Sequence, residues 1–177
     1  MEPRTEQLLA ALEAHPPADE RERRSRSRAL ALVRWLAAPF DETADPTHVT
    51  GSAIVVSPDG RVVLHRHKRL GLWLQPGGHV DGDESAADAA VRETREETGL
   101  VARHPDAGPR LVHVDLHEGP RGHVHLDVRY LLFADTQAGF APEAGESPDV
   151  AWCSPQEAAA RSDASLATAV RSALRAS

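Results

Sequence analysis

The chain has 177 residues and a formal net charge of −7, with 41% hydrophobic and 27% charged residues. This length suits one hydrophobic core, and the composition excludes a disordered chain or a coiled coil. No apolar stretch approaches the roughly 20 residues of a membrane-spanning helix and no signal peptide is evident, so we expect a cytoplasmic protein without a membrane partner. The only cysteine, Cys153, excludes an internal disulfide, and the net acidity argues against nucleic acid as a partner.

Residues 1–44 predict a helical appendage, and residues 45–177 predict the main domain. Two apolar clusters separated by Pro16-Pro17 line the appendage: Leu8, Leu9 and Leu12, then Leu30, Val33, Trp35 and Leu36. The arginine-rich run at residues 20–28 indicates a solvated, salt-bridged helix face, with a contact to a partner or a phosphate group as the alternative. The apolar stripes would suit a partner helix in a homodimer.

From about Thr47 the pattern changes to short strands. Two of them, at residues 49–57 and 61–67, flank the turn Pro58-Asp59-Gly60 and predict a hairpin. Further strands are predicted at residues 72–75, 110–117, 123–133 and 150–153. A central helix is predicted at residues 85–98, with Asp83 as its N-cap and Gly99 at its end, and one or two helices at residues 155–174. This order indicates an α+β domain or a layered α/β/α domain.

The central helix places three glutamates, Glu93, Glu96 and Glu97, within an arc of about 100° on one face. Three alanines lie on or beside the same face: Ala86, Ala89 and Ala90. Because their side chains are small, we expect space for another group next to the carboxylates. The opposite stripe is expected to pack on a sheet: Ala87, Val91, Thr94 and Thr98. Arg92, four residues before Glu96, is placed to orient that carboxylate.

Three converging carboxylates favour a hard divalent cation, most naturally Mg²⁺. The alternative is that the acidic stripe is simply a solvated helix face. The preceding Pro76-Gly77-Gly78 favours the metal site, because glycines let the backbone come close to the helix. Residues 78–100 carry a net charge of −5, so most of the acidity of the chain belongs to this one segment.

The spacing of fixed residues in this segment resembles the Nudix box of the Nudix hydrolases. The matching positions are Gly78, Glu84, Arg92, Glu93, Glu96, Glu97, Gly99 and Leu100. One position departs from the pattern, since Thr94 stands where the family usually has an aliphatic residue. The resemblance extends from about residue 47 to 160 and implies the Nudix fold, an α/β/α sandwich with a mixed sheet, preceded here by the helical appendage.

The resemblance implies that the chain hydrolyses a nucleoside diphosphate linked to another moiety, a small-molecule substrate, by attack of water on phosphorus with Mg²⁺ or Mn²⁺. It implies Glu96 and Glu97 as principal metal ligands, with Glu93 and the carbonyl of Gly78 assisting. Arg92 would orient the carboxylates, and Glu84 would act indirectly.

The resemblance leaves the general base open. Glu97 is one candidate, and a loop glutamate, Glu143 or Glu146, is the other. Nucleoside triphosphates or modified nucleotides are the favoured substrates.

Histidines form a second unusual pattern, because His123, His125 and Asp127 alternate along a predicted strand and therefore share one face. Such residues often occupy ordinary half-exposed strand positions. For His125 together with His79 we also consider a hydrogen bond to substrate phosphate or a place in an extended metal shell. Gln75, just before the glycines, is a further candidate for substrate binding.

Two other functions were weighed against hydrolysis. A noncatalytic Nudix-like module that senses nucleotides would tend to lose the box glutamates, which this chain keeps. Isopentenyl diphosphate isomerase, with a related fold, requires a reactive cysteine ahead of the box, whereas Cys153 lies behind it.

Overall fold

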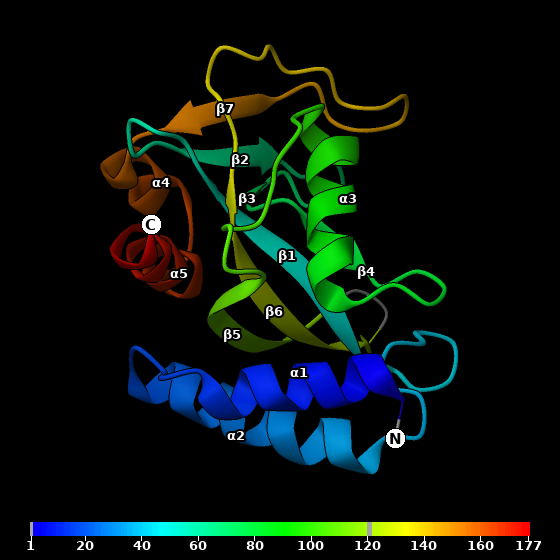
Figure 1. Ribbon diagram of the computed structural model, residues 1–177. Helices are drawn as coiled ribbons and strands as arrows, with labels where there is room; N and C mark the ends of the chain where they lie inside the picture. The colour runs from blue at the N-terminus through cyan, green and yellow to red at the C-terminus, as the bar shows by residue number, and fades with distance from the viewer. Residues whose placement is uncertain (1, 120–121) are drawn as a thin grey trace.

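The computed structural model describes residues 2–119 and 122–177, and shows a seven-stranded sheet between helical layers (Figure 1). The strands are β1 (Thr47–Val56), β2 (Val62–Arg66), β3 (Trp73–Leu74), β4 (Gly77–His79), β5 (Arg110–Glu118), β6 (Val124–Phe133) and β7 (Val150–Cys153). Their order is β3-β2-β1-β6-β5, with β4 paired to β1 and β7 to β2. Because β1 and β6 are parallel and the other pairs antiparallel, the sheet is mixed, as predicted.

Five helices surround the sheet: α1 (Pro3–Ala14), α2 (Glu20–Trp35), α3 (Ala86–Thr98), α4 (Pro155–Arg161) and α5 (Ala164–Ala176). In Figure 1, α3 covers one face, α4 and α5 cover the other, and α1 and α2 lie beside β5. This confirms the predicted layered architecture and the helical N-terminal segment. Among the residues described, no helix has the length and apolarity to cross a membrane.

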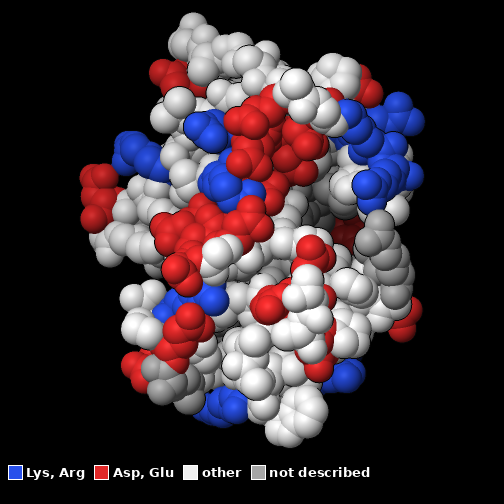
Figure 2. All heavy atoms as spheres, turned by 90° about the vertical axis from the view of Figure 1, so that its right-hand side faces the viewer, with Lys and Arg blue, Asp and Glu red and all other residues white. Residues whose placement is uncertain are grey.

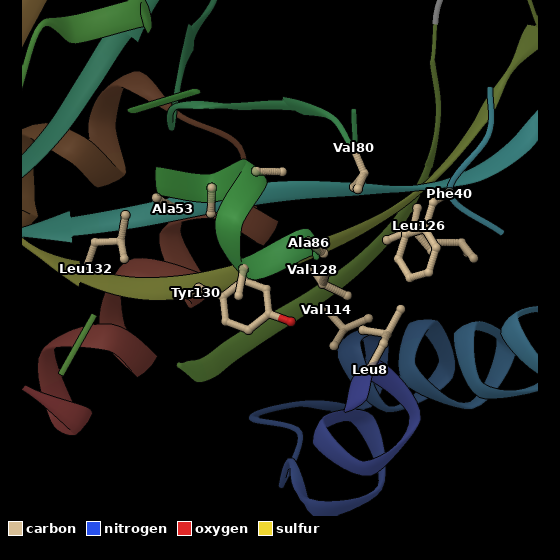
Figure 3. Close-up of a cluster of buried hydrophobic side chains, with 14 of the residues drawn as sticks. Leu8, Phe40, Ala53, Val80, Ala86, Val114, Leu126, Val128, Tyr130 and Leu132 are labelled. Atoms are coloured by element: carbon tan, nitrogen blue, oxygen red, sulfur yellow. The ribbon is translucent and has the colours of Figure 1, made fainter. Parts of the chain in front are cut away.

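The hydrophobic core has two parts, one on each face of the sheet. The first combines α3 and the N-terminal helices with β1, β5 and β6, and the second combines α4 and α5 with the opposite face. In the first, Leu8 of α1 lies with Val114 of β5 and Leu126 of β6 (Figure 3). The apolar stripe of α1 is therefore buried within this chain.

Helix α2 covers the free edge of β5. The Glu22 carboxylate accepts a hydrogen bond from the backbone N–H of Val114 (3.0 Å), and the Ser25 hydroxyl accepts one from Leu116 (3.3 Å). Such contacts occupy edge groups that would otherwise be open to another strand. The prediction of a wholly solvated, salt-bridged face was therefore wrong for Glu22 and Ser25, although Glu20 does pair with exposed Arg23.

The end of α2 also differs from the prediction. Trp35, assigned to an apolar cluster, is 78% exposed, whereas Val33 from the same cluster is buried in the core. The helix places these two residues on different sides, since neighbours two positions apart do not share a helix face.

Helix α3 begins one residue after its N-cap, Ser85, which forms a capping box with Asp88. The prediction of Asp83 as the cap was wrong, because Ser85 is the residue that directly precedes the first helical turn. The end was predicted correctly: Gly99 adopts the left-handed conformation (φ 75°) that glycine tolerates.

The buried face of α3 differs in part from the prediction. Thr94 and Thr98 are buried as expected, but the alanines expected beside the carboxylates are buried too: Ala86, Ala89 and Ala90. They bring α3 very close to β1, since a Cβ on Gly51 would lie 2.2 Å from the carbonyl oxygen of Ala86. Val91, assigned to the packing stripe, is only partly buried.

Candidate active site

The glutamates of α3 lie against the short strand β4. The backbone N–H of Gly77 donates a hydrogen bond to the Glu97 carboxylate at 2.9 Å. A Cβ on Gly78 would lie 2.3 Å from Glu93 Oε1, so only glycine leaves space for that carboxylate. The two glycines predicted to allow a close approach therefore do so, and the approaching groups are Glu93 and Glu97.

Arg92 holds the acidic side chains in fixed positions. Its Nη1 donates to Glu93 (2.8 Å) and Glu96 (3.1 Å), and its Nη2 donates to Glu84 (2.8 Å) and to the carbonyl oxygen of His79 (2.8 Å). Hydrogen bonds from the guanidinium to Glu84, and then to Glu93, raise the pKa of Arg92. Arg92 is thus placed to orient the glutamates and to tie them to β4.

The glutamate cluster concentrates acidic groups in a site that is partly buried from solvent. Burial raises the pKa of Glu97 to about 8, and Glu93, Glu146 and Glu96 add to the increase, while the Gly77 N–H opposes it. Burial likewise raises the pKa of Glu93. Figure 2, a view from the α3 side, shows acidic side chains gathered across this face with basic ones flanking them.

A divalent cation fits this donor set. Mg²⁺ binds carboxylate and carbonyl oxygens and keeps several water ligands, so it needs only a few protein groups on one side. Glu93, Glu96, Glu97 and the carbonyl of Gly78 are the groups that could hold it. Such an ion would offset the burial and the repulsion that together raise the pKa of Glu97.

The loop before β7 brings one of its two glutamates to the cluster. Glu146 contributes to the raised pKa of Glu97, so its carboxylate lies within electrostatic reach. Glu143 instead pairs with exposed Arg95 (3.5 Å), although its backbone N–H donates to the carbonyl oxygen of Glu96 (2.7 Å). The arrangement therefore distinguishes the two residues that the sequence left as equivalent.

His65 of β2 also belongs to the site, and its contact was not predicted. Its Nε2 lies 3.3 Å from Glu97 Oε2, and burial, with a contribution from His67, lowers its pKa to about 4. The alternation of His65 and His67 was visible in the sequence. Nothing local indicated that β2 would place His65 beneath the last turn of α3.

The residues predicted to bind substrate lie elsewhere. Gln75 donates a hydrogen bond to Asp127 (3.2 Å), a buried carboxylate that also accepts from Arg129 (2.8 Å). His79 and His125 lie together in a cluster of histidines. The centres of these two rings are 5.8 Å apart. Among the described residues, none of these three side chains forms a hydrogen bond or ion pair with Glu93, Glu96 or Glu97.

A basic depression of about 220 Å³ is lined by segments that directly follow His65 and Glu146 in the chain. Its lining residues are Arg66, His67, Lys68, Gly71, Ser147 and Asp149. Arg66 follows His65 and Ser147 follows Glu146, so both walls of the depression continue from residues near Glu97. Cations at this place would favour an anionic substrate.

Comparison with known proteins gives one consistent result. Residues 46–173 match the family model of the NUDIX domain. A MutT-like protein of Streptomyces ambofaciens is 29% identical over 132 residues, 73% of this chain and 79% of that protein. A CTP pyrophosphohydrolase of Escherichia coli K12 is 32% identical over 118 residues, 60% of this chain and 76% of that protein. The crystal structure of a NUDIX-family hydrolase from Clostridium perfringens aligns with a TM-score of 0.61 at 29% identity, covering 73% and 97% of the two chains.

Proposed function

This chain belongs to the Nudix hydrolase family and hydrolyses phosphoanhydride bonds; on that premise we propose that it cleaves the diphosphate linkage of a nucleoside diphosphate joined to another moiety, with Mg²⁺ or Mn²⁺. The observation that carries the proposal is the convergence of Glu93 and Glu97 on the glycines of β4, with Arg92 holding Glu93 and Glu96.

The glutamates and Arg92 have separate roles in this proposal. Glu96 and Glu97 are the principal metal ligands, and Glu93 and the Gly78 carbonyl complete the protein side. The ion would neutralise the diphosphate and lower the pKa of a bound water. Arg92 contacts Glu93 and Glu96 directly and acts as a positioning residue.

For the substrate we propose a nucleoside triphosphate or a modified nucleotide. The name of the Escherichia coli relative, a CTP pyrophosphohydrolase, agrees with this class. The basic depression lined by Arg66, His67 and Lys68 supports an anionic ligand. Gln75 remains a proposed substrate contact, held by Asp127. For His79 and His125, a hydrogen bond to substrate phosphate and a place in an extended metal shell both remain proposals, and their side chains lie among other histidines.

The N-terminal segment, residues 1–44, raises two further proposals, on the domain boundary and on a homodimer. We propose a domain boundary at residue 45, which agrees with a family match that begins at residue 46. The stripe that suggested a homodimer is buried in this chain's core, which leaves exposed Trp35 as the apolar feature for a second copy. Light scattering of the full chain and of Trp35→Ala tests this: equal masses would exclude a Trp35 interface.

A substrate panel tests the proposed reaction. Nucleoside triphosphates and other nucleoside diphosphate derivatives are assayed with Mg²⁺ or Mn²⁺ for release of phosphate or pyrophosphate. Glu97→Gln keeps the shape and removes the charge, so we expect the rate to fall at least about 100-fold. Equal rates for wild type and Glu97→Gln on the best substrate would overturn the mechanism.

A matched pair of variants tests the general base. Glu146→Gln removes the loop carboxylate near Glu97, and we expect kcat to fall about 100-fold if that residue accepts the proton. Glu143→Gln, in the same loop but paired with Arg95, should stay within about twofold, because an exposed ion pair contributes little. Near-normal kcat in Glu146→Gln would assign the base to Glu97.

A further inference from the structure

A second group of potential metal ligands lies on the sheet face away from α3. It consists of Glu42, His48, His79, His123 and His125, and we call it the histidine cluster. These residues come from the loop before β1, from β1, from β4 and from the start of β6. The ring centre of His48 lies 5.0 Å from those of His79 and His125, and 5.2 Å from that of His123.

The pairing of strands explains how the cluster forms. His48 lies opposite His125 in the parallel β1–β6 pair, and Thr50 lies opposite His79 in the β1–β4 pair. The next pair, Gly51 and Gly78, faces α3. Since successive residues point to opposite faces, His79 points away from the glutamates, while the backbone of β4 touches them.

His48 is the centre of the cluster and is unusual. Its side chain is 0% exposed, and neither ring nitrogen makes a hydrogen bond of good geometry within residues 2–119 and 122–177. An unsatisfied buried polar group costs about 1–3 kcal/mol. Apart from a weak interaction with the backbone of Asp45, the described residues give this buried imidazole no polar partner, although three histidines and a carboxylate lie nearby, and ordinary packing does not explain that.

Two sets of potential ligand atoms share His48. One consists of His48, His123 and His125, the other of Glu42, His48 and His79, and within each set the atoms lie within 4.8 Å of one another. Ligands of a tetrahedral Zn²⁺ lie about 3.4 Å apart, given Zn–N distances of about 2.0–2.1 Å. Small side-chain rotations would close this difference, and His79 and Glu42 are about half exposed and already in contact at 3.2 Å.

We propose that the histidine cluster binds one transition-metal ion that prefers imidazole ligands, Zn²⁺ foremost. His48, His123 and His125 are the primary ligands, and His79 or Glu42 completes the coordination. Imidazole nitrogens select Zn²⁺ and similar ions, whereas Mg²⁺ selects the oxygens of the glutamate site. The ion would link β1 to β6 and, through His79, to β4. A metal site here is separate from the proposed hydrolase function and goes beyond it.

Gly119, which follows β5, contributes to a defined position for the His125 ring. A Cβ on Gly119 would lie 2.5 Å from Cε1 of the His125 ring, so the chain leaves room for that ring only with glycine at this position. The His125 ring is thereby held beside His48, 5.0 Å away between ring centres.

Metal titration tests the proposal on the full chain. Metal-free protein is titrated with Zn²⁺ against a chromophoric chelator, and separately with Co²⁺, whose visible spectrum reports tetrahedral coordination. The variants are His123→Ala and His125→Gln in the cluster, His104→Ala as a histidine outside it, and Glu96→Gln with Glu97→Gln in the glutamate site. Thermal unfolding with and without Zn²⁺ shows whether each variant is folded and stabilised.

We expect one Zn²⁺ bound by wild type, by His104→Ala and by the glutamate variant, with the same affinity. The affinity should fall at least about 10-fold in His123→Ala and His125→Gln, as for loss of a metal ligand or its support. Absence of Zn²⁺ binding in wild type would overturn the proposal. Binding that is lost in the glutamate variant but kept in both histidine variants would overturn it as well.

Discussion

Glu22 of α2 and Glu97 of α3 are both buried carboxylates, exposed by 1% and 8%, yet their surroundings are opposite. Glu22 lies 2.6 Å from His15 Nε2 and accepts hydrogen bonds from the N–H groups of Ala18 (2.6 Å) and Val114 (3.0 Å). Burial alone would raise its pKa, but the hydrogen bond with His15, then that from Ala18 and the nearby His113, lower it overall. Glu97 accepts a hydrogen bond from the Gly77 N–H and lies 3.3 Å from His65 Nε2, but it also faces other acidic groups, and burial with these groups raises its pKa to about 8.

The difference separates a structural charge from a functional one. At Glu22 the chain supplies every partner that the carboxylate needs, so the ionised form stabilises the fold. At Glu97 the chain brings carboxylates together without enough cations, so the ionised cluster needs a positive charge from outside. The N-terminal helices thus use a glutamate to fix a sheet edge, whereas α3 uses glutamates to hold a ligand.

Removal of the structural charge should give the larger change in stability. Glu22→Gln leaves two backbone donors and His15 with a poorer acceptor, so we expect the free energy of unfolding to fall by about 3 kcal/mol. Urea unfolding at pH 7 measures the change. Glu20→Gln on the same helix removes an exposed carboxylate and should change the stability by less than about 0.5 kcal/mol. Equal effects of the two variants would remove the distinction between structural and surface glutamates.

The local parts of the fold and site could be predicted because they depend on spacing along the chain. The strand and helix patterns, the stop at Gly99 and the contact of Arg92 with Glu96 all follow from backbone periodicity. The same rule misassigned the three alanines of α3. Small side chains were read as room for a ligand, but they serve close packing against Gly51 of β1.

The remaining features depend on contacts between distant segments. His48 meets His125 only because β1 and β6 pair in parallel in that register, and His65 meets Glu97 only because β2 pairs with β1, on which α3 packs. Neither register is visible in a single sequence, since either strand alone fits several pairings. The burial of Glu22 likewise depends on α2 lying along the edge of β5.

Replacement of Glu97 should change the free energy of unfolding in the opposite direction to replacement of Glu22. In metal-free protein at pH 7, Glu97 has to take up a proton on folding because its pKa is raised to about 8. Glu97→Gln keeps an acceptor for the Gly77 N–H without that cost, so we expect the free energy of unfolding to rise by about 2 kcal/mol. Urea unfolding in a chelator measures it, with Glu143→Gln as an exposed control. Saturating Mg²⁺ should reverse the order, because it stabilises only the protein that binds it. A destabilised metal-free Glu97→Gln would show that Glu97 is structural.

The pH dependence gives the smallest and most specific contrast. The lowered pKa of Glu22 means that its stabilisation is complete above the ordinary value of 4.5 and is lost as the pH falls through the lower pKa of the folded state. The raised pKa of Glu97 means that its stabilising, protonated form is complete below 4.5 and is lost as the pH rises through about 8. Unfolding of metal-free wild type, Glu22→Gln and Glu97→Gln from pH 3 to pH 9 measures both. We expect the advantage of wild type over Glu22→Gln to shrink on acidification, and the advantage of Glu97→Gln over wild type to grow as the pH rises. Parallel pH profiles for the three proteins would mean that the two carboxylates do not differ in their coupling to the fold.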